Sequence, residues 1–179
     1  MTALDFTKKY LADARDCENK TGVHHLVTLG QAALESGWGE KAPCNEFFGI
    51  KDSDGINGNE QLLPTTEYSR YPHLSASQVG LATIDRIEWN EASHMFIYHG
   101  KAYFRKYDTP AEAFIDHAKL FFRYNQKHMQ PYAEALPHLK DAYQFVDIIA
   151  PIYASGPGYA TIVQSIMHSL EKLIETYKL

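Results

Sequence analysis

A run of apolar residues at helical spacing, closed by glycines, constrains the fold more than any other feature of this chain. The apolar stripe consists of Val23, Leu26, Val27, Gly30 and Leu34. Intervals of three and four residues predict an amphipathic helix over residues 23–36, which Gly37 ends. Glu35 then lies in the last turn, where apolar neighbours and the negative end of the helix dipole both disfavour a charged carboxylate. We expect Glu35 to be buried against aromatic residues such as Trp38 and Phe48 and to act as a general acid.

The rest of the chain is also patterned mainly as helices. Further helices are expected at residues 3–19, 110–124, 141–150 and 159–177. Thr109-Pro110-Ala111-Glu112 has the sequence of a capping box, and Pro151 should end the helix before it. Between Pro43 and Pro72, glycines and turn formers surround the strand-like run LLPTTEYSRY, which predicts a small β-hairpin lobe. We therefore predict one α+β domain over residues 1–179, mostly α, with a cleft between a helical lobe and a β lobe.

Charge and hydropathy exclude several classes of partner. A formal net charge of −5 without a basic block argues against nucleic acid, because phosphate binding requires clustered lysine and arginine. The chain is 45% hydrophobic, but no apolar run approaches the roughly 20 residues of a membrane span. Residues 1–20 are charged and helix-patterned, unlike a signal peptide. We expect a protein that is made in the cytoplasm and then released or delivered, with Cys17 and Cys44 as free thiols.

The nine histidines do not suggest a catalytic metal. His24 and His25 are adjacent and would point to different faces of a helix, while His94 and His99 are five residues apart. Ligands on one helix face are usually three or four residues apart, and the chain contains neither HExxH nor paired CxxC. The sequence therefore predicts no metal and no other cofactor.

Five blocks occur in a recognisable order between about residues 20 and 175. They are AALESGWG, NEFFGIK, TTEY, FRKYDTPAEAFIDHA and YASGPGYA. In this order they resemble the glucosaminidases of glycoside hydrolase family 73, which are lysozyme-like enzymes that cut peptidoglycan. The resemblance implies a lysozyme-like fold and hydrolysis of the β-1,4 bond between N-acetylglucosamine and N-acetylmuramic acid, without a cofactor.

The resemblance also implies roles for individual residues. Glu35 matches the general acid, and Glu67 in TTEY matches a glutamate that activates water or stabilises the positive sugar ring. Tyr153 matches a tyrosine that supports the reacting sugar, although the aspartate of that motif is Gly156 here. The candidate sugar contacts are Trp38, Phe48, Tyr68 and Tyr159, of which Tyr159 could instead begin the packed face of the last helix. Glu60, Glu88 and Glu91 stay open as alternatives to Glu67.

The chain departs from the family pattern between the TEY and FR-Y blocks. Similar enzymes join these strands by a short hairpin, whereas Glu67 and Phe104 are 37 positions apart here (104 − 67). We expect a helical insertion at about residues 69–100, with residues 77–98 as its helix, because Val79, Ile84, Ile87 and Met95 are spaced apolar residues in a helix-favouring stretch.

Two other functions stay open on the sequence. A lytic transglycosylase also uses one glutamic acid but closes an anhydro ring, and an inactive module would only bind or assemble peptidoglycan. Inverting, retaining and substrate-assisted hydrolysis are equally open. We expect a monomer that acts on peptidoglycan strands in the periplasm or the extracellular wall. A holin, a secretion machine or an immunity protein would be its partner.

Overall fold

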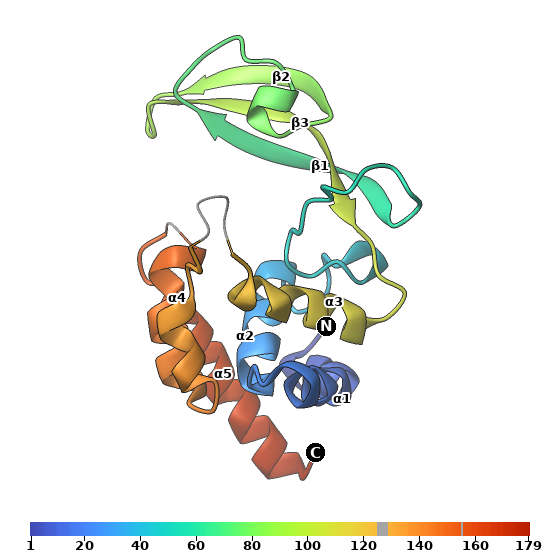
Figure 1. The fold of residues 1–179 in the computed structure, drawn as a ribbon, viewed down its shortest axis with the longest axis vertical. Helices are drawn as coiled ribbons and strands as arrows, with labels where there is room; N and C mark the ends of the chain where they lie inside the picture. The colour runs from blue at the N-terminus through green and yellow to red at the C-terminus, as the bar shows by residue number, and fades with distance from the viewer. Residues whose placement is uncertain (125–128, 155) are drawn as a thin grey trace. The chain divides into compact units, whose positions relative to one another are not determined.

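The computed structural model describes residues 1–124, 129–154 and 156–179, and the chain divides into two compact units. A helical unit comprises residues 1–48 and 107–179, and a sheet unit comprises residues 49–106. Each unit is described by itself (Figure 1). The predicted class, α+β and mostly α with a small β lobe, is confirmed.

The helical unit is built around α2. Its α-helices are α1 (Ala3–Thr21), α2 (His25–Ser36), α3 (Pro110–Lys119), α4 (Ala142–Tyr153) and α5 (Tyr159–Tyr177). Short 3₁₀ helices occupy Pro43–Asn45, Leu120–Phe122 and Ala133–His138. Most residues of α2 are buried, as expected of a helix that packs on several sides. It contacts α1, α4 and α5, and Figure 1 shows it in light blue among these helices.

Local signals explain where these helices begin and end. The Thr109 hydroxyl accepts from the Glu112 backbone N–H and the Glu112 carboxylate accepts from the Thr109 backbone N–H, so the predicted capping box is confirmed. Gly37 ends α2 in the left-handed conformation that favours glycine. Gly30 lets α5 approach α2 closely, since a Cβ atom there would lie 2.8 Å from Cγ of Met167.

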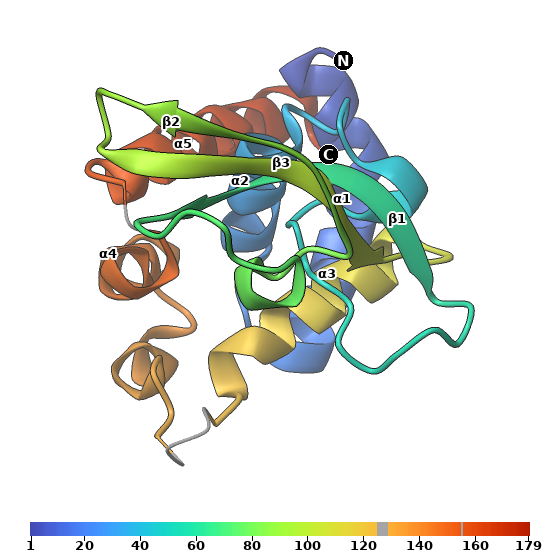
Figure 2. The ribbon, with the colours of Figure 1, turned by 90° about the horizontal axis from the view of Figure 1, so that it is seen from above.

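The sheet unit contains three antiparallel strands, β1 (Glu60–Ser69), β2 (Thr83–Asn90) and β3 (Met95–Arg105). Their order is β1-β3-β2, and Figure 2 shows β3 between the other two. A short 3₁₀ helix, Ser77–Val79, precedes β2. The strands enclose a small apolar core of Leu81, Tyr98, Ala102 and Phe104.

Three expectations about secondary structure are wrong. The predicted helix at residues 77–98 is replaced by β2 and the start of β3, because backbone pairing with β3 overrides a weak local preference for helix. The helix expected to stop before Pro151 continues to Tyr153, with the proline in its last turn. The helix expected to reach residue 124 ends at Lys119 and continues as the 3₁₀ turn Leu120–Phe122.

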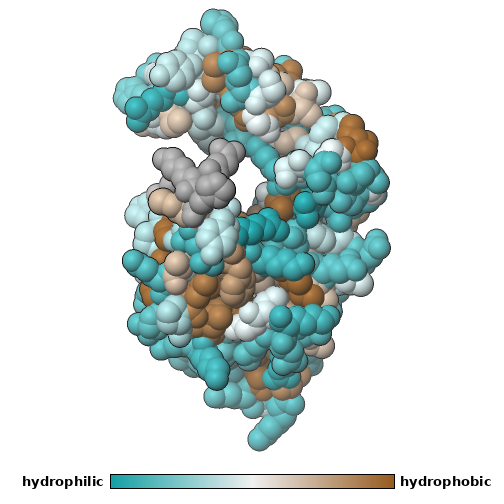
Figure 3. Space-filling model, viewed as in Figure 1, coloured by the Kyte–Doolittle hydropathy of each residue, from teal (hydrophilic) through white to brown (hydrophobic). Residues whose placement is uncertain are grey.

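No helix in the described ranges is both long and apolar enough to cross a bilayer. The face drawn in Figure 3 is mainly hydrophilic, with apolar patches between the charged and polar side chains.

Gly100 gives a test of the sheet register. A Cβ atom at this position would lie 1.9 Å from the backbone oxygen of Thr83, so Gly100→Ala must push β2 away from β3. We expect the free energy of unfolding to fall by about 1–3 kcal/mol, the usual cost of overpacking. Urea denaturation would measure it. Gly156→Ala is the control, since a Cβ there meets nothing within 4 Å. Equal stability of the two variants would contradict the register.

Candidate active site

Glu35 lies in the last turn of α2, as predicted, but its side chain is exposed. The expectation of a carboxylate buried against Trp38 and Phe48 is therefore wrong. Its Oε1 atom instead accepts a hydrogen bond of 2.9 Å from the hydroxyl of Tyr159, the first residue of α5. One oxygen is thus held by the protein while the carboxyl group remains accessible to a ligand.

Gln31, one helical turn before Glu35, completes a short chain of hydrogen bonds. Its Nε2 donates to the Tyr159 hydroxyl over 3.1 Å, and that hydroxyl donates to Glu35. A tyrosine hydroxyl carries one proton. Because the Tyr159 hydroxyl donates this proton to Glu35, its oxygen acts as the acceptor for the Gln31 amide. Because Gln31 is fully buried, it holds the Tyr159 oxygen in a defined position.

Tyr153, at the end of α4, lies beside Tyr159. The two rings stack with centroids 5.5 Å apart and planes 30° apart. The Tyr153 hydroxyl shares a hydrogen bond of 3.1 Å with Nε2 of His117 on α3. Burial, with the Glu35 charge adding to it, raises the pKa of both tyrosines above the ordinary value. Both hydroxyls therefore stay protonated and remain available as donors.

Phe48 and Trp38 have different surroundings, although the sequence suggested the same role for both. Phe48 stacks on the His117 ring with centroids 3.8 Å apart and planes 11° apart, which joins it to the Tyr153 and Tyr159 rings through His117. Trp38 makes an edge contact with Phe6, 5.6 Å between centroids, and packs at the margin of the core. Phe48 is thus joined to the ring cluster near Glu35, whereas Trp38 packs on α1.

Glu67 and Tyr68 belong to the sheet unit and lie next to each other on β1. Glu67 is half-buried, and its carboxylate accepts from Nζ of Lys51, which also donates to the backbone oxygen of Gly80 over 2.9 Å. Tyr68 is 57% exposed, as a sugar-stacking residue can be. Lys51 therefore holds the Glu67 side chain in a defined place on the sheet.

Two of the alternatives to Glu67 have local roles that account for their presence. Glu60 accepts from the backbone N–H groups of Asn57 and Gly58, which orders the preceding loop. Glu88 pairs with His99 and lies 3.6 Å from Arg86. Glu91 is exposed after the end of β2.

Sequence reasoning missed Gln31, Glu46 and His117. Gln31 and Glu35 are four residues apart, a spacing that places both on one face of a helix and could have identified the pair. His117 falls between Phe114 and Phe121 at helical spacing, which could have marked it as buried. Glu46 is 5% exposed and accepts from the Phe48 backbone N–H over 3.0 Å, a turn contact with no clear sequence signal.

His117 predicts a pH dependence of stability. Burial lowers its pKa to about 3 in the folded chain, whereas the ordinary value is 6.5. Between these pH values the unfolded chain binds one more proton than the folded chain. The contribution of neutral, buried His117 to stability is therefore complete above pH 6.5 and is lost as the pH falls toward 3. This histidine should contribute a slope approaching 1.4 kcal/mol per pH unit, to order of magnitude. Urea unfolding from neutral to acidic pH would measure it. A His117→Gln variant should show a shallower slope, and an unchanged slope would contradict the assignment.

Tyr159→Phe should weaken catalysis without unfolding the chain. The variant removes the donor to Glu35 and leaves the Gln31 amide without its acceptor. A hydrogen bond to a charged group is worth about 1.5–3 kcal/mol, so kcat should fall about tenfold or more. Tyr143→Phe is the matched control, because its hydroxyl also donates to a carboxylate, that of Glu171 on α5. Equal kcat values in the two variants would exclude a role for Tyr159.

Comparison with known proteins identifies relatives along nearly the whole chain. A family model described as "Glucosaminidase: Mannosyl-glycoprotein endo-beta-N-acetylglucosaminidase" matches residues 11–172. The peptidoglycan hydrolase FlgJ of Salmonella typhimurium is 30% identical over 185 residues, which cover 97% of this chain and 49% of that protein. The exo-glucosaminidase LytG of Bacillus subtilis is 28% identical over 151 residues, covering 81% of this chain and 43% of LytG. The chain thus spans about half the length of the curated relatives it matches.

Solved structures show the same fold. The glycoside hydrolase domain of Salmonella typhimurium FlgJ matches with a TM-score of 0.70 at 25% identity, over 99% of this chain and 94% of that domain. The catalytic domain of the autolysin Auto from Listeria monocytogenes matches with a TM-score of 0.69 at 24% identity, over 98% of this chain and 88% of that one.

Proposed function

This chain belongs to the glucosaminidase family, and from that premise we propose that it hydrolyses peptidoglycan at the β-1,4 bond that follows N-acetylglucosamine. The carrying observation is the arrangement of Gln31, Tyr159 and Glu35, which presents an accessible carboxyl group with one oxygen held by a hydrogen bond. The names of FlgJ and LytG, a peptidoglycan hydrolase and an exo-glucosaminidase, support the substrate class.

Glu35 acts as the general acid in this proposal. It donates its proton to the glycosidic oxygen as the bond breaks. The resulting carboxylate accepts a hydrogen bond from the Tyr159 hydroxyl, which already contacts it. Tyr153 supports the reacting sugar through its ring face or its protonated hydroxyl, with His117 fixing the orientation of the ring. Phe48, Tyr68 and Tyr159 supply further contacts to sugars.

Glu67 is the second carboxylate of the proposed reaction. It activates the attacking water or stabilises the positive charge on the sugar ring. The Lys51 ammonium contacts the Glu67 carboxylate and fixes its position, which suits either role. None of these steps requires a metal or an organic cofactor.

The wall is the proposed site of action, outside the cytoplasmic membrane. We propose a monomer whose partner is the glycan strand, and a holin, a secretion machine or an immunity protein would account for its release or control.

Mass spectrometry of digested peptidoglycan tests the proposal directly. The digest is reduced with borohydride, so that each new reducing end is recorded as a sugar alcohol. We expect N-acetylglucosaminitol ends in the digest and none above background with Glu35→Gln. Muramitol ends would contradict the bond assignment, 1,6-anhydro ends would identify a lytic transglycosylase, and no new ends from folded protein would identify an inactive binding module.

A further inference from the structure

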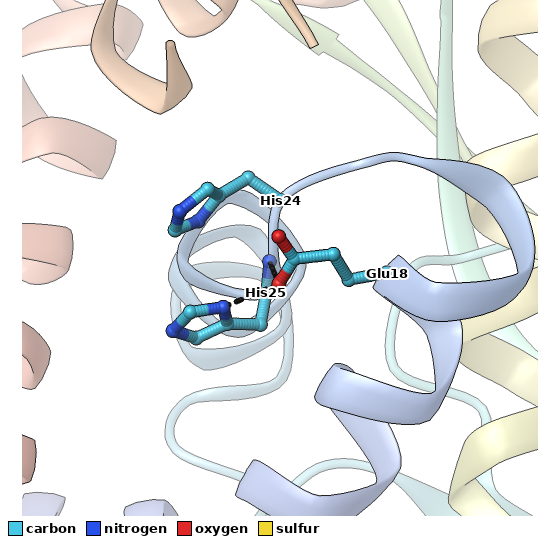
Figure 4. A group of neighbouring side chains, drawn as sticks. All are labelled: Glu18, His24 and His25. Atoms are coloured by element: carbon cyan, nitrogen blue, oxygen red, sulfur yellow. Dashed lines mark hydrogen bonds and ion pairs between the residues drawn. The ribbon is translucent and has the colours of Figure 1, made fainter. Parts of the chain in front are cut away.

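Glu18, His24 and His25 meet where α1 ends and α2 begins. Figure 4 shows the Glu18 carboxylate reaching from α1 toward two imidazole rings that lie one above the other. The ring centroids of His24 and His25 are 4.4 Å apart and the planes 24° apart. The expectation that these histidines point to different faces of a helix is therefore wrong. His24 is the N-cap and has a non-helical backbone (φ −57°, ψ 136°), so the helical rotation between successive residues does not separate the two rings.

The three side chains offer ligand atoms in one place. One nitrogen from each histidine and one oxygen from Glu18 lie within 4.8 Å of one another. A tetrahedral zinc ion with bonds near 2.0–2.2 Å places its ligands roughly 3.5 Å apart, so small side-chain rotations would close the set. Nδ1 of His24 accepts from the Leu26 backbone N–H over 3.2 Å, which leaves Nε2 of that ring to face an ion.

The contacts of Glu18 already hold the group together. Its Oε2 accepts from the backbone N–H of His25 over 3.1 Å and lies 2.5 Å from Nδ1 of the same residue. A carboxylate oxygen and imidazole nitrogens are both common ligands of divalent transition metals.

We propose that Glu18, His24 and His25 bind one divalent transition-metal ion, with zinc as the best match, and that the ion fastens the end of α1 to the start of α2. Two imidazoles and one carboxylate are an established ligand set for zinc, with water in the fourth position. The ion replaces the proton shared by Glu18 and His25, and that proton leaves to solvent.

The site is independent of the proposed reaction, so its test uses binding and stability. The protein is freed of bound metal with EDTA, dialysed, and titrated with zinc chloride by calorimetry. Its melting temperature is recorded with and without zinc. We expect one ion per chain and a higher melting temperature, because an ion that binds only the folded state stabilises it. Glu18→Gln, His24→Asn and His25→Asn should each weaken binding about tenfold or more, since even a group that only supports a ligand is worth roughly 10–100-fold.

These substitutions are chosen to preserve the local fold around the three side chains. Asparagine at position 24 can still cap α2, and asparagine at position 25 can still donate to Glu18. His73→Asn is the matched control, because His73 is an exposed histidine of the sheet unit. The proposal is overturned if folded chain binds no zinc, if the double variant of His24 and His25 binds as tightly as the unchanged chain, or if His73→Asn alone removes binding.

Discussion

Glu35→Gln should keep its fold and hydrolyse peptidoglycan at least about 100-fold more slowly, since general acid catalysis contributes roughly 10²–10⁴. The glutamine amide has nearly the same shape as the carboxyl group, and its oxygen can still accept from the Tyr159 hydroxyl. It cannot supply the proton that the leaving sugar oxygen needs. The rate loss therefore reports proton transfer and not local unfolding.

Turnover on purified peptidoglycan, measured as new reducing ends, would give the size of this effect. Glu40→Gln is the matched control, because Glu40 is also exposed and lies just after α2. Its carboxylate forms an ion pair with the N-terminal amine at the surface. It should retain nearly full activity. If Glu35→Gln has an unchanged melting temperature and near-normal turnover, Glu35 is not the general acid and the mechanism proposed above fails.

Glu67→Gln is the second substitution with a large expected effect, a loss of about 100-fold in turnover. Glutamine can still accept from Lys51, so the hydrogen bond and the strand should survive while the negative charge is lost. If Glu67 activates water or stabilises a positive sugar ring, that charge is the property the reaction needs. The measurement is kcat on peptidoglycan beside the melting temperature.

Glu88→Gln and Glu91→Gln are the controls, because both lie in the same sheet unit and the sequence left both open as alternatives. Each should keep most of its activity. If Glu67→Gln retains turnover while Glu88→Gln or Glu91→Gln loses it, the second carboxylate lies elsewhere in the sheet unit, and the role of Glu35 is unaffected.

Local signals in the sequence were enough to predict the family and most of the helices. Motifs in the family order identify a glucosaminidase, and the model match over residues 11–172 confirms it. Apolar spacing and end signals such as Gly37 and the Thr109 capping box predict helices well, because both act between residues within a few positions of each other. The placement of Glu35 in the last turn of α2 follows from the same local signals.

The contacts around Glu35, in contrast, could not be predicted from local signals. Tyr159 is 124 positions from Glu35 and His117 is 36 positions from Tyr153, so no local pattern could pair them. The same holds for β2, where the spacing of apolar residues predicted a helix but the chain forms a strand that pairs with β3. The exposure of Glu35 has the same origin. Trp38 packs against Phe6 and Phe48 packs against His117, and neither covers the Glu35 carboxylate. Contacts between distant segments are set by packing and by backbone pairing across the whole chain, and these are properties that spacing in the sequence does not record.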